Sequence, residues 1–225
     1  MVKNLIRTGI CATVLLAASQ PASAETGDFL IRGRMNYVMP MDDSGLIRPG
    51  FGDLPSGASL DNSIGAEISV TYFLSNNFGV EFGFMGSKLD LFGDDQTPAQ
   101  GKLASAKYIM PNATLQYHFM PKAAVRPYIG FGVNYIRYYD ESPGSVLELA
   151  DKSPRRIQPT ATLEARFGYH GQIGFDIPLN DRVFFNIDVK YVKTNTVAKF
   201  VTNDIDFVDV DVDPFIFGAG FGFRF

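Results

Sequence analysis

The chain has 225 residues, with 24 acidic against 20 basic side chains and a formal net charge of −4. This mild acidity argues against a nucleic-acid partner, because such proteins present clustered positive charge. The only cysteine, Cys11, lies in an N-terminal apolar run, so the mature chain is not expected to contain disulfides, thiolate metal sites or cysteine nucleophiles.

The N-terminal residues are typical of a secretory signal peptide. Lys3 and Arg7 precede the apolar run at 10–18, and small residues at 22–24 provide a cleavage site. A membrane anchor is the alternative interpretation, but this run is too short to span a bilayer. The predicted parts of the chain are a signal peptide at 1–24 and a single mature domain at 25–225.

Alternating apolar and polar residues predict eight strands in the mature domain. In each strand, residues of one parity are large and apolar, whereas residues of the other parity are charged, polar or glycine. The pattern is clearest at the C-terminus, where Phe221, Phe223 and Phe225 share a face opposite Gly222 and Arg224. The predicted strands are 29–39, 63–74, 78–85, 108–119, 126–139, 166–177, 182–194 and 215–225.

This pattern favours an all-β fold, an eight-stranded antiparallel transmembrane β-barrel with its apolar face toward lipid. Pro111 is expected to cause a bulge or a local break in pairing, because proline lacks an N–H donor. The connections alternate in length, and such barrels keep short turns in the periplasm and long loops outside. The predicted short turns are 75–77, 120–125 and 178–181, and the long loops are 40–62, 86–107, 140–165 and 195–207.

Eight strands leave room inside for side chains or one small ligand, not for a wide aqueous pore. Four basic and four acidic residues are predicted to face inward, and paired charges are favoured because isolated buried ions are very costly. A structural polar plug is one interpretation, and a specific ion pathway is the other. The predicted plug has a periplasmic group, Arg224, Arg32, Asp176 and Glu81, and a central group, Arg34, Glu67, Asp188 and Lys190.

No catalytic residue, metal site or cofactor is predicted. His118 and His170 both face inward, but two histidines with scattered carboxylates are a weak metal signal, and hydrogen-bonded plug residues are the favoured interpretation. The sequence has no nucleophile elbow, phosphate-binding loop or zinc-helix motif, so an enzyme is not expected. The glycines at 218–222 lie in a strand and are expected to make room inside the barrel.

Near the extracellular rim the polarity of the wall inverts, and apolar residues take the inward parity. Such a lining suits a cup for a hydrophobic molecule rather than a channel for ions or sugars. Packing of the loops against one another is the alternative. The predicted cup residues are Val38, Met85, Tyr108, Met110, Ile136, Tyr138, Phe200, Val208, Val210 and Val212.

The segments 115–119, 126–135, 211–215 and 222–225 together resemble the OmpW family, and 77–81 and 171–176 are similar to its third and sixth strands. The resemblance covers essentially the whole mature chain. It implies an eight-stranded outer-membrane barrel with a hydrophobic channel on the extracellular side that passes small hydrophobic molecules. Alkane-uptake relatives belong to the same group. The chain lacks tryptophan, and Phe215 stands where many relatives have one, so no gating residue is transferred.

The C-terminal aromatic residues also resemble the signal by which bacterial outer-membrane proteins are recognised for insertion. Phe221, Phe223 and Phe225 carry this resemblance. It predicts the bacterial outer membrane as the location and the barrel-assembly machinery as a partner of the C-terminal strand.

Three functional hypotheses follow. The first is a passive channel for a small hydrophobic solute, which enters the cup, meets the plug and leaves sideways into the bilayer. The second is a structural or adhesive barrel whose loops contact host, phage or lipopolysaccharide. The third, a lipid enzyme, is the weakest, because no serine, histidine and acid set converges on an exterior site. In each case outer-membrane lipid and lipopolysaccharide surround the barrel.

Overall fold

The computed structural model describes residues 26–41, 58–93, 101–143, 160–163, 165–201, 207–211 and 213–225. The predicted signal peptide at 1–24 lies outside the described residues, so its removal stays a prediction. No helix in the described part of the chain has the length and apolar character needed to cross a membrane.

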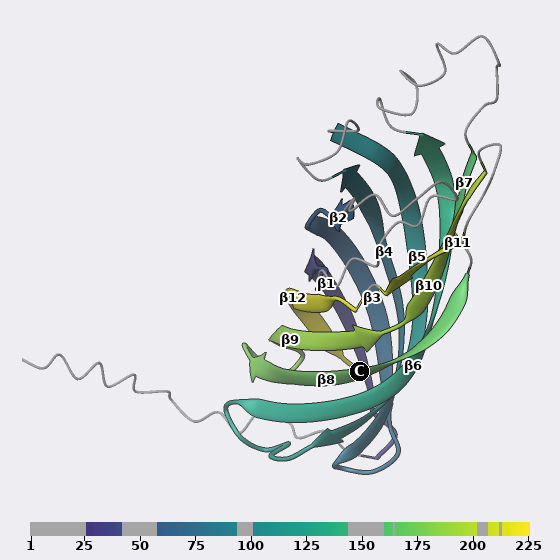
Figure 1. Cartoon of the computed structure of the whole chain (residues 1–225). Helices are drawn as coiled ribbons and strands as arrows, with labels where there is room; N and C mark the ends of the chain where they lie inside the picture. Colours follow the sequence, from purple (N-terminus) through teal and green to yellow (C-terminus); the bar gives the residue numbers. More distant parts are fainter. Residues whose placement is uncertain are drawn as a thin grey trace, which may run out of the picture.

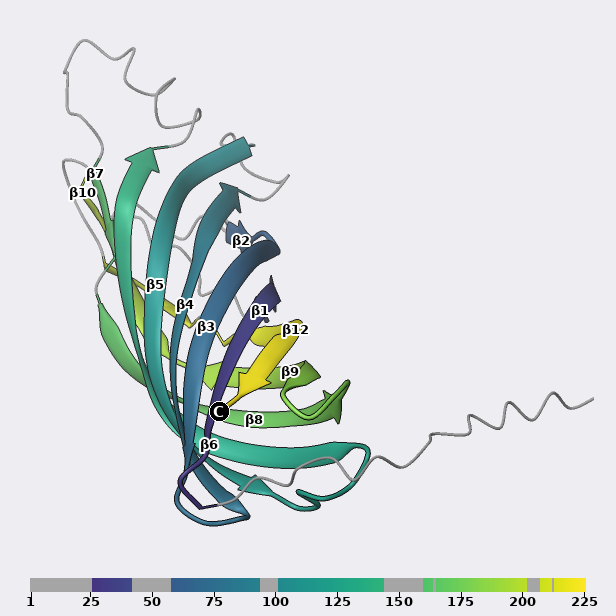
Figure 2. The ribbon, with the colours of Figure 1, turned by 180° about the vertical axis from the view of Figure 1, so that it is seen from behind.

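Eight main strands form a closed antiparallel barrel, which confirms the predicted fold class (Figures 1 and 2). Each main strand pairs with the next main strand along the chain, and the ladder between the first (β1) and the last (β12) closes the ring. The strands are β1 (Phe29–Met39), β3 (Ser63–Phe73), β4 (Phe78–Gly93), β5 (Gly101–His118), β6 (Arg126–Pro143), β8 (Arg166–Pro178), β9 (Val183–Lys193) and β12 (Phe215–Arg224).

The alternation in sequence becomes an alternation in burial. Along β1 and β3, every second residue is exposed and the intervening residues are buried. The outward Phe131 is 64% exposed, whereas the inward Arg32 is 0% exposed. A closed barrel satisfies the backbone groups of its strands within the wall, so these apolar side chains can face lipid without leaving unpaired backbone polar groups in it. The predicted inward and outward parity is therefore confirmed in all eight strands.

The strand ends differ from the prediction on the side of the long loops. β4 continues to Gly93 and β5 begins at Gly101, so most of the expected loop at 86–107 is a hairpin, and β6 continues to Pro143. The strands were predicted only as far as apolar residues alternate outward with polar residues inward, but the backbone ladder does not depend on which face is apolar. The short strand β2 (Ala58–Leu60) and a separate sheet of β7 (Thr160–Leu163), β10 (Asn195–Val201) and β11 (Phe207–Asp211) were also not predicted.

Pro111 interrupts pairing on one side of its strand only. It pairs with Phe84 of β4, but the ladder to β6 passes from Ile109 to Asn112 without a pair at Pro111. The register is the same before and after this gap, so the local break is confirmed and a bulge at Pro111 is wrong. The irregularity between these two strands lies instead between Ser105 and Lys107.

The short turns and the C-terminus lie at one end of the barrel. The backbone N–H of Arg224 donates to the carbonyl of Arg182, which lies in the turn between β8 and β9 (2.8 Å). By the usual orientation of such barrels, this end faces the periplasm. The long β4–β5 hairpin and the far end of β6 then extend on the extracellular side (Figure 1).

The outward parity can be tested at Val189, near the middle of β9, where it pairs with Phe217 and Ile173. Val189→Arg should destabilise the barrel by about 2–4 kcal/mol, because it places a charge in the hydrocarbon core. The difference is measured by titrating the liposome-inserted protein with urea and following the folded fraction by heat-modifiable migration on gels. Val189→Leu is the control, and equal folding of Val189→Arg and wild type would contradict the assigned register.

Candidate functional site

The inward residues change from polar to apolar at the same height on several strands. Along β5, inward Gln116, Thr114 and Asn112 are followed toward the extracellular side by Met110 and Tyr108. The other strands make the same change at Asn36 to Val38, Asn134 to Ile136 and Lys190 to Val192. The interior therefore consists of a central polar layer beneath an upper apolar layer.

Arg32 is the centre of the periplasmic part of the polar layer. Its guanidinium lies 2.9 Å from Glu81 and 2.8 Å from Asp176, and it donates to Thr71. The same guanidinium lies 5.3 Å from the ring centre of Tyr128, a distance compatible with a cation–π contact. Since Arg32, Glu81 and Asp176 belong to β1, β4 and β8, these contacts cross the lumen and close it.

Arg34 and Lys190 occupy the next level. Arg34 lies 2.8 Å from Asp188, 3.2 Å from Glu81 and 3.3 Å from Glu67. The Nζ atom of Lys190 lies 2.5 Å from Glu67. Because Glu81 contacts both arginines, the two predicted groups of charges form one continuous network.

The predicted plug needs one correction, which concerns Arg224. This residue pairs with Asp28 at the periplasmic end, rather than with one of the four predicted carboxylates in the ion pairs described above. The network thus has three cations and four carboxylates, rather than four of each. Neutral donors supply further hydrogen bonds: Gln172 donates to Asp188 (2.5 Å) and Asn186 donates to Asp176 (2.7 Å). Such bonds stabilise buried carboxylates in addition to their ion pairs, because a buried charge needs its remaining lone pairs satisfied.

The two histidines have separate hydrogen-bond partners in the polar layer. His170 Nε2 lies 2.8 Å from the Thr114 hydroxyl, and His118 Nε2 lies 3.3 Å from the Gln116 side-chain oxygen. The His118 ring also stacks on Tyr128, with the ring centres 5.0 Å apart. Within the ranges that the structure describes, no three histidine, cysteine or acidic side chains gather as a metal site would require.

Six of the ten predicted cup residues lie together in the upper apolar layer. They pack in one cluster with Ala106, Val192 and Ile216, which were not predicted, and the six are Val38, Met85, Tyr108, Met110, Ile136 and Tyr138. Met85 and Met110 are at most 2% exposed, so this layer is packed rather than open. The side chains of Phe200, Val208 and Val210, and all of Val212, lie outside the described residues. A ligand-binding role for these ten residues stays a prediction.

A lower apolar layer was missed by the sequence reasoning. Leu30, Phe73 and Phe184 are buried together at the periplasmic end of the lumen. Each lies two residues from a polar inward position, at Arg32, Thr71 and Asn186. The parity rule alone could therefore have placed these three side chains inside the barrel.

A closed barrel of eight strands, with an apolar outer band and a charged network inside the lumen, is a transmembrane barrel of the outer-membrane class. The profile of the OmpW family matches residues 25–225. The chain belongs to the OmpW family, and it is an integral protein of the bacterial outer membrane.

Relatives and solved structures agree with this assignment. Outer membrane protein W of Vibrio cholerae is 29% identical over 96% of this chain and 98% of its own length. Outer membrane protein AlkL of Ectopseudomonas oleovorans is 24% identical, over 92% of this chain and 86% of its own length. The crystal structure of OprG from Pseudomonas aeruginosa has a TM-score of 0.80 and 30% identity, over 90% of this chain and 98% of that chain.

Gly218 tests how tightly the polar layer is packed. A Cβ atom at Gly218 would overlap the side chain of Asp188, the partner of Arg34. Gly218→Ala should therefore destabilise the barrel by roughly 1–3 kcal/mol, as overpacking of a well-filled core does. Gly171→Ala, which meets nothing within 4 Å, is the matched control in a urea-unfolding series. Equal stability of the two variants would contradict the close packing at Asp188.

Conductance tests whether the lumen is closed. Because the charge network crosses the lumen from β1 to β4, β8 and β9, purified protein in planar bilayers should give little or no current. A stable, large and weakly selective conductance would contradict the occluded lumen.

Proposed function

We propose that the chain is an outer-membrane channel, not an enzyme, for passive uptake of small hydrophobic molecules. The observation that carries the proposal is the upper apolar layer directly above a polar layer joined by ion pairs. An apolar solute is favoured in the first layer and disfavoured in the second, since entering the second would separate buried charges from their partners. The OmpW resemblance, with its hydrophobic-solute channels, supports the same substrate class.

We further propose that the solute leaves sideways into the bilayer. Support comes from the uneven height of the wall: β4, β5 and β6 have 16 to 18 residues, whereas β1, β9 and β12 have 10 or 11. The upper apolar layer lies where the shorter strands end, since Val38 precedes the last residue of β1 and Ile216 is the second residue of β12. The separate sheet of β7, β10 and β11 lies on the other side, beside the upper part of β6 and away from β1 and β12 (Figure 2).

Entry of a solute requires movement in the packed layer, and its composition suits such movement. Met85 and Met110 are unbranched and flexible, so they can adapt to an apolar guest at small cost. In the same proposal, residues 1–24 are removed on export, and the C-terminal strand with Phe221, Phe223 and Phe225 engages the barrel-assembly machinery. These three phenylalanines are exposed on the lipid-facing side.

The double variant Met110→Gln with Ile136→Asn tests the role of the upper apolar layer. Each change removes apolar contact worth on the order of 1 kcal/mol, so solute binding should weaken by roughly tenfold or more for the pair. Uptake of a labelled alkane or fatty acid into proteoliposomes measures the effect. Heat-modifiable migration verifies that the barrel is folded.

Lys107→Gln is the matched control, because Lys107 is adjacent to Tyr108 but is exposed on the outer face. Its uptake should equal that of wild type. Equal uptake by the folded double variant and wild type would overturn the channel proposal and favour the structural or adhesive barrel.

A further inference from the structure

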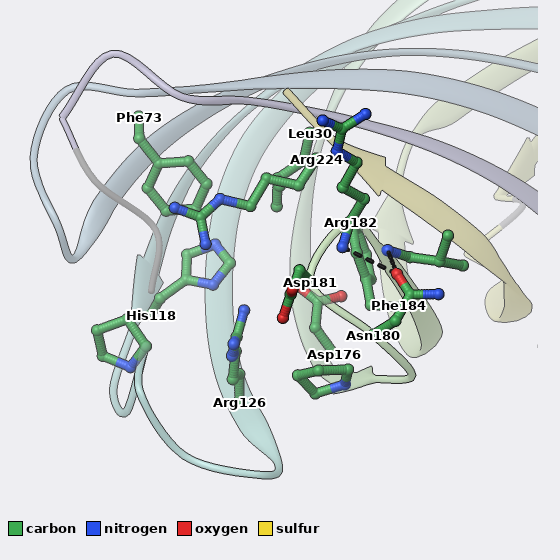
Figure 3. Close-up of a pocket in the computed structure, with 13 residues that line it drawn as sticks. Leu30, Phe73, His118, Arg126, Asp176, Asn180, Asp181, Arg182, Phe184 and Arg224 are labelled. Carbon is green, nitrogen blue, oxygen red and sulfur yellow. Dashed lines mark hydrogen bonds between the residues drawn. The ribbon is translucent and has the colours of Figure 1, made fainter. Parts of the chain in front are cut away.

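The periplasmic end of the barrel contains a recess with an apolar wall and several cationic side chains (Figure 3). It is narrow, with a cavity volume of about 20 Å³, and it opens to solvent. Leu30, Phe73 and Phe184 of the lower apolar layer form the inner wall. The charged and histidine side chains around it are His118, Arg126, Asp176, Asp181, Arg182 and Arg224.

A second, wider groove lies on the outside of the same end. It has a volume of about 520 Å³ and is lined by the β8–β9 turn and the end of the chain. Phe223 and Phe225 line it and are 50% and 71% exposed. Arg182 and Arg224 line both hollows, so the groove and the recess are adjacent and share these two cations.

The turn that carries Arg182 is held by its own hydrogen bonds. The side-chain oxygen of Asn180 accepts from the backbone N–H groups of Arg182 and Val183, at 2.9 and 2.8 Å. The carbonyl of Arg182 accepts from the backbone N–H of Arg224, which fixes the turn against β12. The Arg182 side chain is exposed at this fixed position.

The local charge balance favours an anion. Three arginines line the recess against two aspartates, and Asp176 is already held by Arg32 at 2.8 Å and by Asn186. Asp28, outside the recess lining, pairs with Arg224. A guanidinium group matches the geometry of a phosphate and can donate two parallel hydrogen bonds to it.

We propose that this site binds the phosphate group of an anionic phospholipid of the periplasmic leaflet. Arg182 is the principal contact, Arg126 and Arg224 add positive potential, and the acyl chains lie along Phe223 and Phe225. A lipid is favoured over a free anion because the groove is lined by both Arg182 and Arg224 and by the exposed, lipid-facing Phe223 and Phe225 of the chain's end. This proposal does not depend on the function proposed above.

The test measures binding of short-chain phosphatidylglycerol to the full barrel in a zwitterionic detergent, by native mass spectrometry. Short-chain phosphatidylcholine and inorganic phosphate are measured in parallel. Wild type should prefer phosphatidylglycerol, and Arg182→Gln should weaken its binding by about tenfold, the loss expected when a charge-assisted contact is removed. Arg182→Lys should bind with intermediate affinity, because it keeps the charge but loses the paired donors.

Lys122→Gln is the matched control, since Lys122 is an exposed cation in the β5–β6 turn at the same end but lines neither hollow. It should bind like wild type, and heat-modifiable migration establishes that each variant is folded. Equal affinity of wild type and Arg182→Gln would overturn the proposal. Equal losses in Arg182→Gln and Lys122→Gln would also overturn it, because they would indicate only a diffuse charge effect. Binding of inorganic phosphate as tight as that of phosphatidylglycerol would replace the lipid site with a free-anion site.

Discussion

The pairing of buried charges across the lumen is the interaction on which the rest of the structure depends. Arg32 and Arg34 extend from β1 to carboxylates on β3, β4, β8 and β9, so one strand is tied to both neighbouring and opposite parts of the wall. Removing one partner of a buried ion pair typically costs about 3–5 kcal/mol, because the other charge is left uncompensated. The charges therefore fix the relative positions of strands that make no ladder with each other.

The polar layer and the upper apolar layer are held by different kinds of interaction. Side chains in the polar layer are held by several partners each, as Glu81 is by Arg32, Arg34 and Ser69. Above it, the upper apolar layer is held mainly by packing, which is non-directional and permits rearrangement. A rigid polar floor beneath an adaptable apolar layer is the arrangement that the proposed channel requires.

The outer surface shows a corresponding asymmetry between extracellular and periplasmic ends. On the extracellular side β4, β5 and β6 extend beyond the other main strands, and their exposed faces carry ion pairs such as Lys107 with Asp140 (2.6 Å). On the periplasmic side the wall ends in short turns, with exposed phenylalanines beside arginines. An apolar groove next to guanidinium groups is complementary to an amphiphile with an anionic headgroup.

The sequence by itself determined the fold class, the main strands and the direction of their side chains, because apolar residues at every second position of a strand identify the face that contacts lipid. It also predicted the seven charges of the central network, and that they must be paired, although it wrongly added Arg224 to them. It did not determine the partners, since the pairing of Arg224 with Asp28 and the link of both arginines through Glu81 depend on which strands meet across the barrel. The packed state of the upper apolar layer and the long β4–β5 hairpin were likewise decided by the tertiary structure. Backbone pairing continues wherever two strands remain adjacent, and side chains fill the space inside the closed wall. The alternation of residues in a single strand shows neither how far its neighbour extends nor how much space remains inside the barrel.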